Sequence, residues 1–87
     1  MKMIIVIVKD SDAEPVTQAL TASDFRVTRI ASTGGFLRSG VVTLLIGLDD
    51  ERVDACIQVI REKLGESDSQ KNRATLFVVP VQRFEQV

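Results

Sequence analysis

Two apolar stretches decide the fold: MKMIIVIV at positions 1–8 and VVTLLIGL at positions 41–48. Both are rich in β-branched or aliphatic residues and show no strict alternation with polar ones, which is typical of strands buried on both faces. Each is far shorter than the ~20 residues that a membrane-spanning helix needs. The first stretch also lacks the small-residue cleavage site of a signal peptide. We therefore expect two strands that are buried on both faces and no membrane association.

Between these strands, the segment KDSDAEPV predicts the start of a helix. Ser11 and Glu14 have the spacing of a capping box, but Pro15 favours Asp12 as the N-cap, because proline then falls in the first turn, where its missing N–H costs nothing. An apolar stripe then extends the helix to about Ser23. The next segment, FRVTRIAS at 25–32, predicts a strand that points Phe25 and Val27 to one side and Arg26 and Thr28 to the other. The glycine-rich TGGFLRSG at 33–40 predicts a loop.

The second half of the chain repeats this order of elements. Asp49 and Asp50 predict the cap of a second helix, Gly65 predicts its end, and one apolar stripe lies between them: Val53, Cys56, Ile57, Ile60 and Leu64. The polar ESDSQKN at 66–72 predicts a loop, RATLFVVPV at 73–81 a fourth strand, and 82–87 a tail.

The resulting order, βαββαβ, predicts an α+β fold of the ferredoxin-like type, as a single domain over 1–87. Right-handed crossovers place both helices on one face of a four-stranded antiparallel sheet. Three of the strands are nevertheless apolar on both faces. Since the helices can cover only one face, we expect the other to be buried by another chain.

Composition excludes several functional classes. The net charge of −1 argues against a nucleic-acid binder, and the chain has no histidine and a single cysteine, Cys56. These residues provide neither the ligands of a zinc site nor a Ser-His or Cys-His nucleophile pair, so we expect no cofactor, no metal and no enzymatic activity. A lone cysteine cannot form an internal disulfide, which fits a reducing compartment; we expect Cys56 to be a buried helix residue.

Charge is distributed unevenly along the chain. The stretch 25–48 contains Arg26, Arg29 and Arg38 and no acidic residue, and its centre is the glycine-rich loop. Glycines expose backbone N–H donors, arginine matches phosphate, and Phe36 can stack on a base, which together predict a site for a small anionic ligand, plausibly a nucleotide. The alternatives are a plain Gly34–Gly35 hairpin turn, solvated arginines and a Phe36 packed into a neighbouring subunit.

Four segments, MKMIIVIV, DFRVTRIASTGGFLRSG, GLDDERVD and ATLFVVPV, together resemble the PII-like cyclic-di-AMP receptors of the PstA/DarA type over nearly the whole chain. The resemblance implies a homotrimer whose three sheets face inward and whose clefts between subunits bind cyclic di-AMP. It also implies a cytoplasmic signal receptor that is not an enzyme and that acts through a downstream protein.

The resemblance implies a role for individual residues. Arg26 and Thr28 match a strand pair that meets the phosphate and base of the ligand. Gly35, Phe36 and Leu37 match the loop lining the base pocket, and Gly47 matches a position of close approach. The remaining matched contacts are Phe77 in the fourth strand and Gln86 in the tail.

Two departures from the family pattern bear on the ligand. Val41 stands where well-known receptors have an asparagine that hydrogen-bonds adenine, and leaving that base edge unpaired costs roughly 1–3 kcal/mol. The short GESDSQKNR at 65–73 replaces a longer glycine-rich loop, and Arg73 is a candidate for a compensating phosphate contact. Two alternatives therefore stay open: a PII-like protein for a different small anionic ligand, and a trimeric protein-interaction module without a nucleotide.

Overall fold

The computed structural model describes residues 1–30, 40–65 and 73–87. Its elements follow the order β1, α1, β2, β3, a short 3₁₀ turn η1, α2 and β4, so the predicted βαββαβ order is confirmed. Their bounds are Lys2–Lys9 (β1), Asp10–Ala22 (α1), Val27–Ile30 (β2), Val41–Leu48 (β3), Asp50–Arg52 (η1), Val53–Leu64 (α2) and Ala74–Pro80 (β4).

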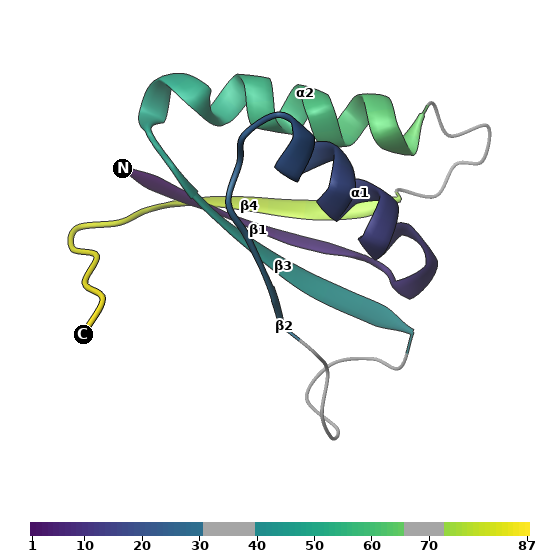
Figure 1. The fold of residues 1–87 in the computed structure, drawn as a ribbon, viewed down its shortest axis with the longest axis horizontal. Helices are drawn as coiled ribbons and strands as arrows, with labels where there is room; N and C mark the ends of the chain where they lie inside the picture. Colours follow the sequence, from purple (N-terminus) through teal and green to yellow (C-terminus); the bar gives the residue numbers. More distant parts are fainter. Residues whose placement is uncertain (31–39, 66–72) are drawn as a thin grey trace.

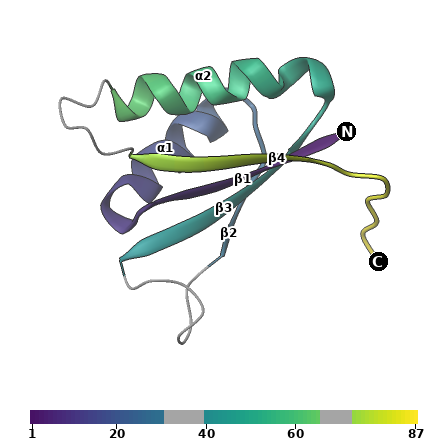
Figure 2. The same cartoon turned by 180° about the vertical axis from the view of Figure 1, so that it is seen from behind.

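The strands form one antiparallel sheet in the order β2-β3-β1-β4. Two of the three strands predicted to be apolar on both faces, β1 and β3, are its centre, whereas the third, β4, is an edge strand, as is β2. Both helices lie on the same side of the sheet (Figures 1 and 2), as the ferredoxin-like pattern requires. In the described part of the chain, no helix is long and apolar enough to cross a membrane.

The core lies between the helices and one face of the sheet. Alternate residues of the central strands point toward the helices and are almost fully buried: Ile4, Val6, Val8, Leu44 and Ile46. The helices contribute Ala13, Val16, Leu20, Cys56, Ile60 and Leu64 to the same cluster. The apolar stripes predicted from the sequence are therefore the helix faces that pack against the sheet. This is expected because burial of apolar area is the main favourable contribution to folding.

The start of α1 differs from the sequence prediction. The helix begins at Asp10, its N-cap position is Lys9, and no side chain caps it, so neither Ser11 nor Asp12 has the expected role. Pro15 consequently lies inside the helix, where it leaves the carbonyl of Ser11 without its i+4 donor. Asp12 is used differently: its carboxylate accepts a hydrogen bond from Arg73 at 2.9 Å.

The end of α1 is a Schellman motif built without glycine. Asp24 has a φ of +67°, its N–H donates to Thr21 O, and the N–H of Phe25 donates to Leu20 O. The side chains of Leu20 and Phe25 are both buried. Arg52 then closes the turn, because its guanidinium donates to the carbonyls of residues 23 and 24 and lies 4.2 Å from the centre of the Phe25 ring.

The second helix starts through the 3₁₀ turn. Asp49 occupies the N-cap position of η1, but no side-chain cap bond forms there, so the predicted aspartate cap is not made. Asp50 instead lies 3.1 Å from the ammonium group of Met1, whose hydrogen bond lowers the pKa of this carboxyl. Gly65 ends α2 with a φ of +72°, as predicted. A side chain is rarely accommodated at that angle.

The edge strands are shorter than the sequence predicts. The expected strand 25–32 is hydrogen-bonded only over Val27–Ile30, because the Schellman motif takes up Phe25; residues 31 and 32 lie outside the described residues. The expected strand 73–81 spans Ala74–Pro80.

The sheet face opposite the helices is apolar and partly exposed. Met3, Ile5 and Leu45 are half-buried there, and Phe77 and Ile30 are 52% and 41% exposed. No described helix covers this face, which we call the open face. It is the second apolar surface that the double-sided strands predict.

Candidate functional site

Three of the residues singled out from the sequence lie together on the open face. The β2–β3 register pairs Thr28 with Leu45 and ends at the pair Val27–Ile46, so Arg26 and Gly47 are the next residues of the two segments beyond this last pair. Arg26 and Thr28 are both exposed, whereas Val27 between them packs against the core. The alternation read from the sequence is thus correct, and it brings a guanidinium, a hydroxyl and a bare backbone position to one corner of the sheet.

Gly47 leaves space on this face. Its φ is not in the left-handed region, and a Cβ atom added there would meet only the terminal methyl of Met1, at 3.2 Å. The far end of a methionine can move, so neither backbone conformation nor packing among the described residues requires glycine. A group approaching from outside would benefit from its missing side chain. Sequence analysis did not single out Met1, because its side chain reaches position 47 only through the β1–β3 pairing, in which Met3 lies opposite Gly47.

Arg29 of β2 and Arg26, which lies just before β2, face opposite sides of the sheet. Arg29 faces the helices, and its guanidinium lies 3.4 Å from Asp10 and 3.5 Å from Glu14 on α1. Arg26, on the open face, makes no hydrogen bond or ion pair with the described residues. A guanidinium in this position can take a phosphate without breaking an existing pair. Arg26, and not Arg29, is therefore the cation that this strand offers to an anion.

Phe77 does not lie at this corner of the sheet. It pairs with Ile5 of β1, which in turn pairs with Leu45, so Phe77 and Thr28 share a row of the open face but lie on opposite edge strands. Three strand spacings separate them, roughly 14 Å. The residues assigned from the resemblance therefore form two groups, one at each edge of the sheet.

The other assigned residues lie further away or outside the described part. Val41 is half-buried at the first position of β3, six residues from Gly47 along the strand, or roughly 20 Å. Gln86 lies on the exposed tail that leaves the sheet after β4 (Figure 1). Gly35, Phe36 and Leu37 lie outside the described residues, as does Arg38.

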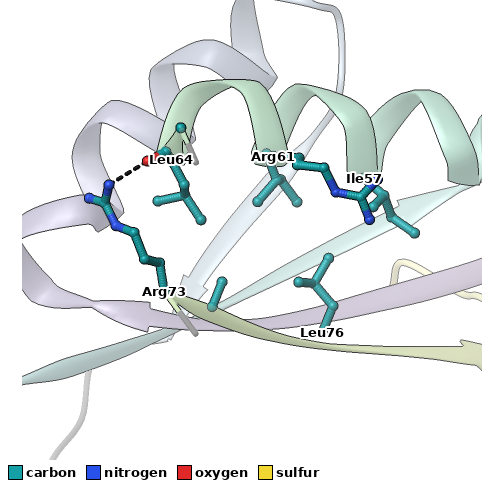
Figure 3. Close-up of a pocket in the computed structure, with 8 residues that line it drawn as sticks. Ile57, Arg61, Leu64, Arg73 and Leu76 are labelled. Atoms are coloured by element: carbon teal, nitrogen blue, oxygen red, sulfur yellow. Dashed lines mark hydrogen bonds between the residues drawn. The ribbon is translucent and has the colours of Figure 1, made fainter. Parts of the chain in front are cut away.

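Arg73 already has hydrogen-bond partners within the chain. Its guanidinium donates to Asp12 of α1. It also donates to the carbonyl of Leu64 at the end of α2, as Figure 3 shows. The side chain therefore joins both helices to the start of β4, on the helix side of the sheet. The compensating phosphate contact considered from the sequence would require this arginine to leave both partners.

Cys56 is fully buried in α2. Burial raises the pKa of its thiol to about 11, against a smaller opposing effect of the Arg52 charge. The thiol is thus protonated and shielded near neutral pH, as expected for a core residue.

Comparison with known proteins places these features in a family. A family model described as cyclic-di-AMP receptor matches residues 1–73. Among solved structures, the chain resembles a protein of unknown function from Pediococcus pentosaceus, with 33% sequence identity and a TM-score of 0.78. The similarity covers 99% of this chain and 96% of the other, so it extends over the fold from end to end.

Proposed function

The chain belongs to the cyclic-di-AMP receptor family, and we propose that it is a signal-transduction protein that binds cyclic di-AMP in clefts between the subunits of a homotrimer. The observation that carries the proposal is the position of Arg26, which has no partner among the described residues and lies at the end of the β2–β3 pair where Gly47 also follows the last paired residue. Arginine supplies a planar pair of donors for a phosphodiester, and glycine lets the ligand approach the sheet closely.

The division of the site between two edges supports its location between subunits. Arg26, Thr28 and Gly47 lie at the β2–β3 edge, whereas Phe77 lies on β4. A cleft formed by the β2–β3 edge of one subunit and β4 of the next would bring these two groups together. The same arrangement would bury the apolar open face, including Phe77 and Ile30, whose exposure in a single subunit is unfavourable.

The proposal includes a role without catalysis. Ligand binding would change the surface that a downstream protein contacts, in the cytoplasm, and Arg26 and Thr28 would bind the ligand and not transform it. A nucleotide other than cyclic di-AMP is the second candidate, because Val41 presents an apolar side chain where an amide would pair with adenine.

Calorimetric titration of the purified protein with cyclic di-AMP tests the proposal, with ATP and cyclic di-GMP as comparisons. We expect saturable binding of cyclic di-AMP near one ligand per chain. Binding of only another nucleotide would support the second candidate instead. A folded trimer that gives neither heat nor a thermal shift with any nucleotide would contradict both candidates and favour a protein-interaction module.

The assembly is tested separately by sedimentation. We expect a trimer for the wild type and dissociation when Ile5→Lys places a charge in the centre of the open face. Lys2→Gln, a change of a half-buried side chain at the start of the same strand, is the matched control and should remain trimeric. A wild-type protein that sediments as a monomer would contradict the homotrimer.

A further inference from the structure

A groove lies between α2 and β4, on the helix side of the sheet and away from the open face. Its volume is about 300 Å³, and its apolar lining comes from Ile57, Ile60, Leu64, Ala74 and Leu76 (Figure 3). Ile60 and Leu64 belong to the core, whereas Ile57 and Leu76 are only partly buried. The groove therefore extends the core to the surface, beside the edge strand β4.

Gly65 and two arginines, Arg61 and Arg73, complete the lining, and no acidic side chain of the described residues belongs to it. Arg73 is hydrogen-bonded to Asp12 and to the carbonyl of Leu64, and it lines one end of the groove. Arg61 is exposed on the last turns of α2 and has no hydrogen bond or ion pair among the described residues, so its guanidinium is available to a ligand. Among the residues of 1–30, 40–65 and 73–87, the groove thus combines an apolar surface with one available positive charge, that of Arg61.

We propose that the α2–β4 groove is a second ligand site, independent of the nucleotide cleft, for a small amphiphile with an aliphatic tail and a carboxylate head. The tail lies on Ile57, Ile60 and Leu76, and the carboxylate accepts hydrogen bonds from Arg61. An apolar pocket of this size with few polar groups is usual for small-ligand sites, and a guanidinium pairs with a carboxylate through two parallel hydrogen bonds.

The charge pattern selects this class of ligand. A cationic amphiphile would meet two guanidinium groups at the groove, and a neutral one would leave Arg61 without a partner. Because the head group lies at the surface, its attraction to Arg61 is screened by salt. Affinity for the carboxylate should therefore fall as ionic strength rises, whereas the contribution of the apolar tail remains.

Titration of the ¹⁵N-labelled protein with octanoate, followed by amide chemical shifts, tests this site. We expect saturable shifts confined to α2 and β4. Arg61→Gln should weaken octanoate binding about tenfold, the loss of one charged hydrogen-bonding partner. Lys63→Gln is the matched control, because Lys63 is a cation on the same turn of α2 but does not line the groove; it should leave the affinity unchanged.

A second variant tests the apolar part of the groove without changing charge. Ala74→Met places a larger apolar side chain in the groove and should abolish octanoate binding while leaving cyclic di-AMP binding unchanged. Non-saturable or dispersed shifts, equal binding of octyltrimethylammonium, or unchanged affinity in Arg61→Gln would each overturn the inference. None of these results bears on the nucleotide cleft, which the calorimetric titration tests alone.

Discussion

The carboxylate of Asp12 lies 2.9 Å from the guanidinium of Arg73, across 61 positions of sequence. This pair joins the first turn of α1 to the residue before β4, and Arg73 also donates to the carbonyl of Leu64 at the end of α2. One side chain therefore holds three elements together. The Asp12 side chain is only 15% exposed, which makes the pair stronger than a typical surface ion pair.

The first prediction concerns this pair. Arg73→Ala removes the donor of two hydrogen bonds and leaves the half-buried Asp12 carboxylate without a cation. We therefore expect the free energy of unfolding to fall by about 1–3 kcal/mol. Urea denaturation measures the change. Arg83→Ala, which removes an arginine from an exposed pair in the tail, is the matched control and should change stability little. Equal effects of the two substitutions would contradict a structural role for Arg73.

The second prediction separates the two arginines around β2. Arg26→Gln should weaken cyclic di-AMP binding by about 10- to 100-fold, because a charged hydrogen-bond partner of the phosphate is lost. Arg29→Gln should leave the affinity nearly unchanged, since that guanidinium pairs with Asp10 and Glu14 on the helix side. Calorimetry on both variants provides the comparison. A larger loss of affinity in Arg29→Gln would move the site away from the open face.

The third prediction concerns the ligand itself. Val41→Asn introduces an amide that can pair with an adenine edge, and we expect it to raise the affinity for cyclic di-AMP by about 5- to 150-fold. Val41→Ala controls for the loss of the valine side chain. If cyclic di-AMP bound both variants equally, position 41 would not face a base, and the second candidate would lose its main argument.

The fourth prediction concerns the dependence of stability on pH. The pKa of Cys56 is raised to about 11 in the folded protein, so the unfolded thiol, with its lower pKa, ionises first. The associated stability is fully present below the unfolded pKa and decreases as the pH rises toward 11. Between pH 8 and pH 11, the melting temperature of the wild type should therefore fall more steeply than that of Cys56→Ala. The difference between the two proteins should begin at pH ~9, the pKa of the unfolded thiol. Parallel curves for the two proteins would contradict the pKa shift.

The fifth prediction concerns the end of α1. Asp24 has a positive φ that glycine adopts without steric cost, so Asp24→Gly should raise the free energy of unfolding by about 0.5–1 kcal/mol. Ser23→Gly is the control, because Ser23 has a φ of −94° and gains nothing from the change. A loss of stability in Asp24→Gly would mean that the aspartate side chain, and not the backbone angle, stabilises this turn.

The sequence alone determined the order of the elements, the apolar strands with two buried faces, the buried stripes of the helices and the apolar open face. These follow from local periodicity, because a residue's neighbours along the chain decide which side of a helix or strand it occupies. The alternation of Phe25, Arg26, Val27 and Thr28 could be predicted for the same reason. The helix caps could not be predicted in this way. Asp12 could either cap α1 or pair with Arg73, which is distant in the sequence, and only tertiary packing selects between these two roles.

Tertiary structure also decided which of the candidate residues lie near one another. Strand pairing brings Arg26 and Gly47 to the same end of the β2–β3 pair, directs Arg29 to α1, and puts Phe77 at the opposite edge of the sheet. The sequence contains these residues but not their register, because hydrogen bonding between strands joins positions far apart in the chain. Similarity of residues thus identified the family, whereas the register showed that Arg29 faces the helices and that Phe77 lies on the edge strand opposite β2.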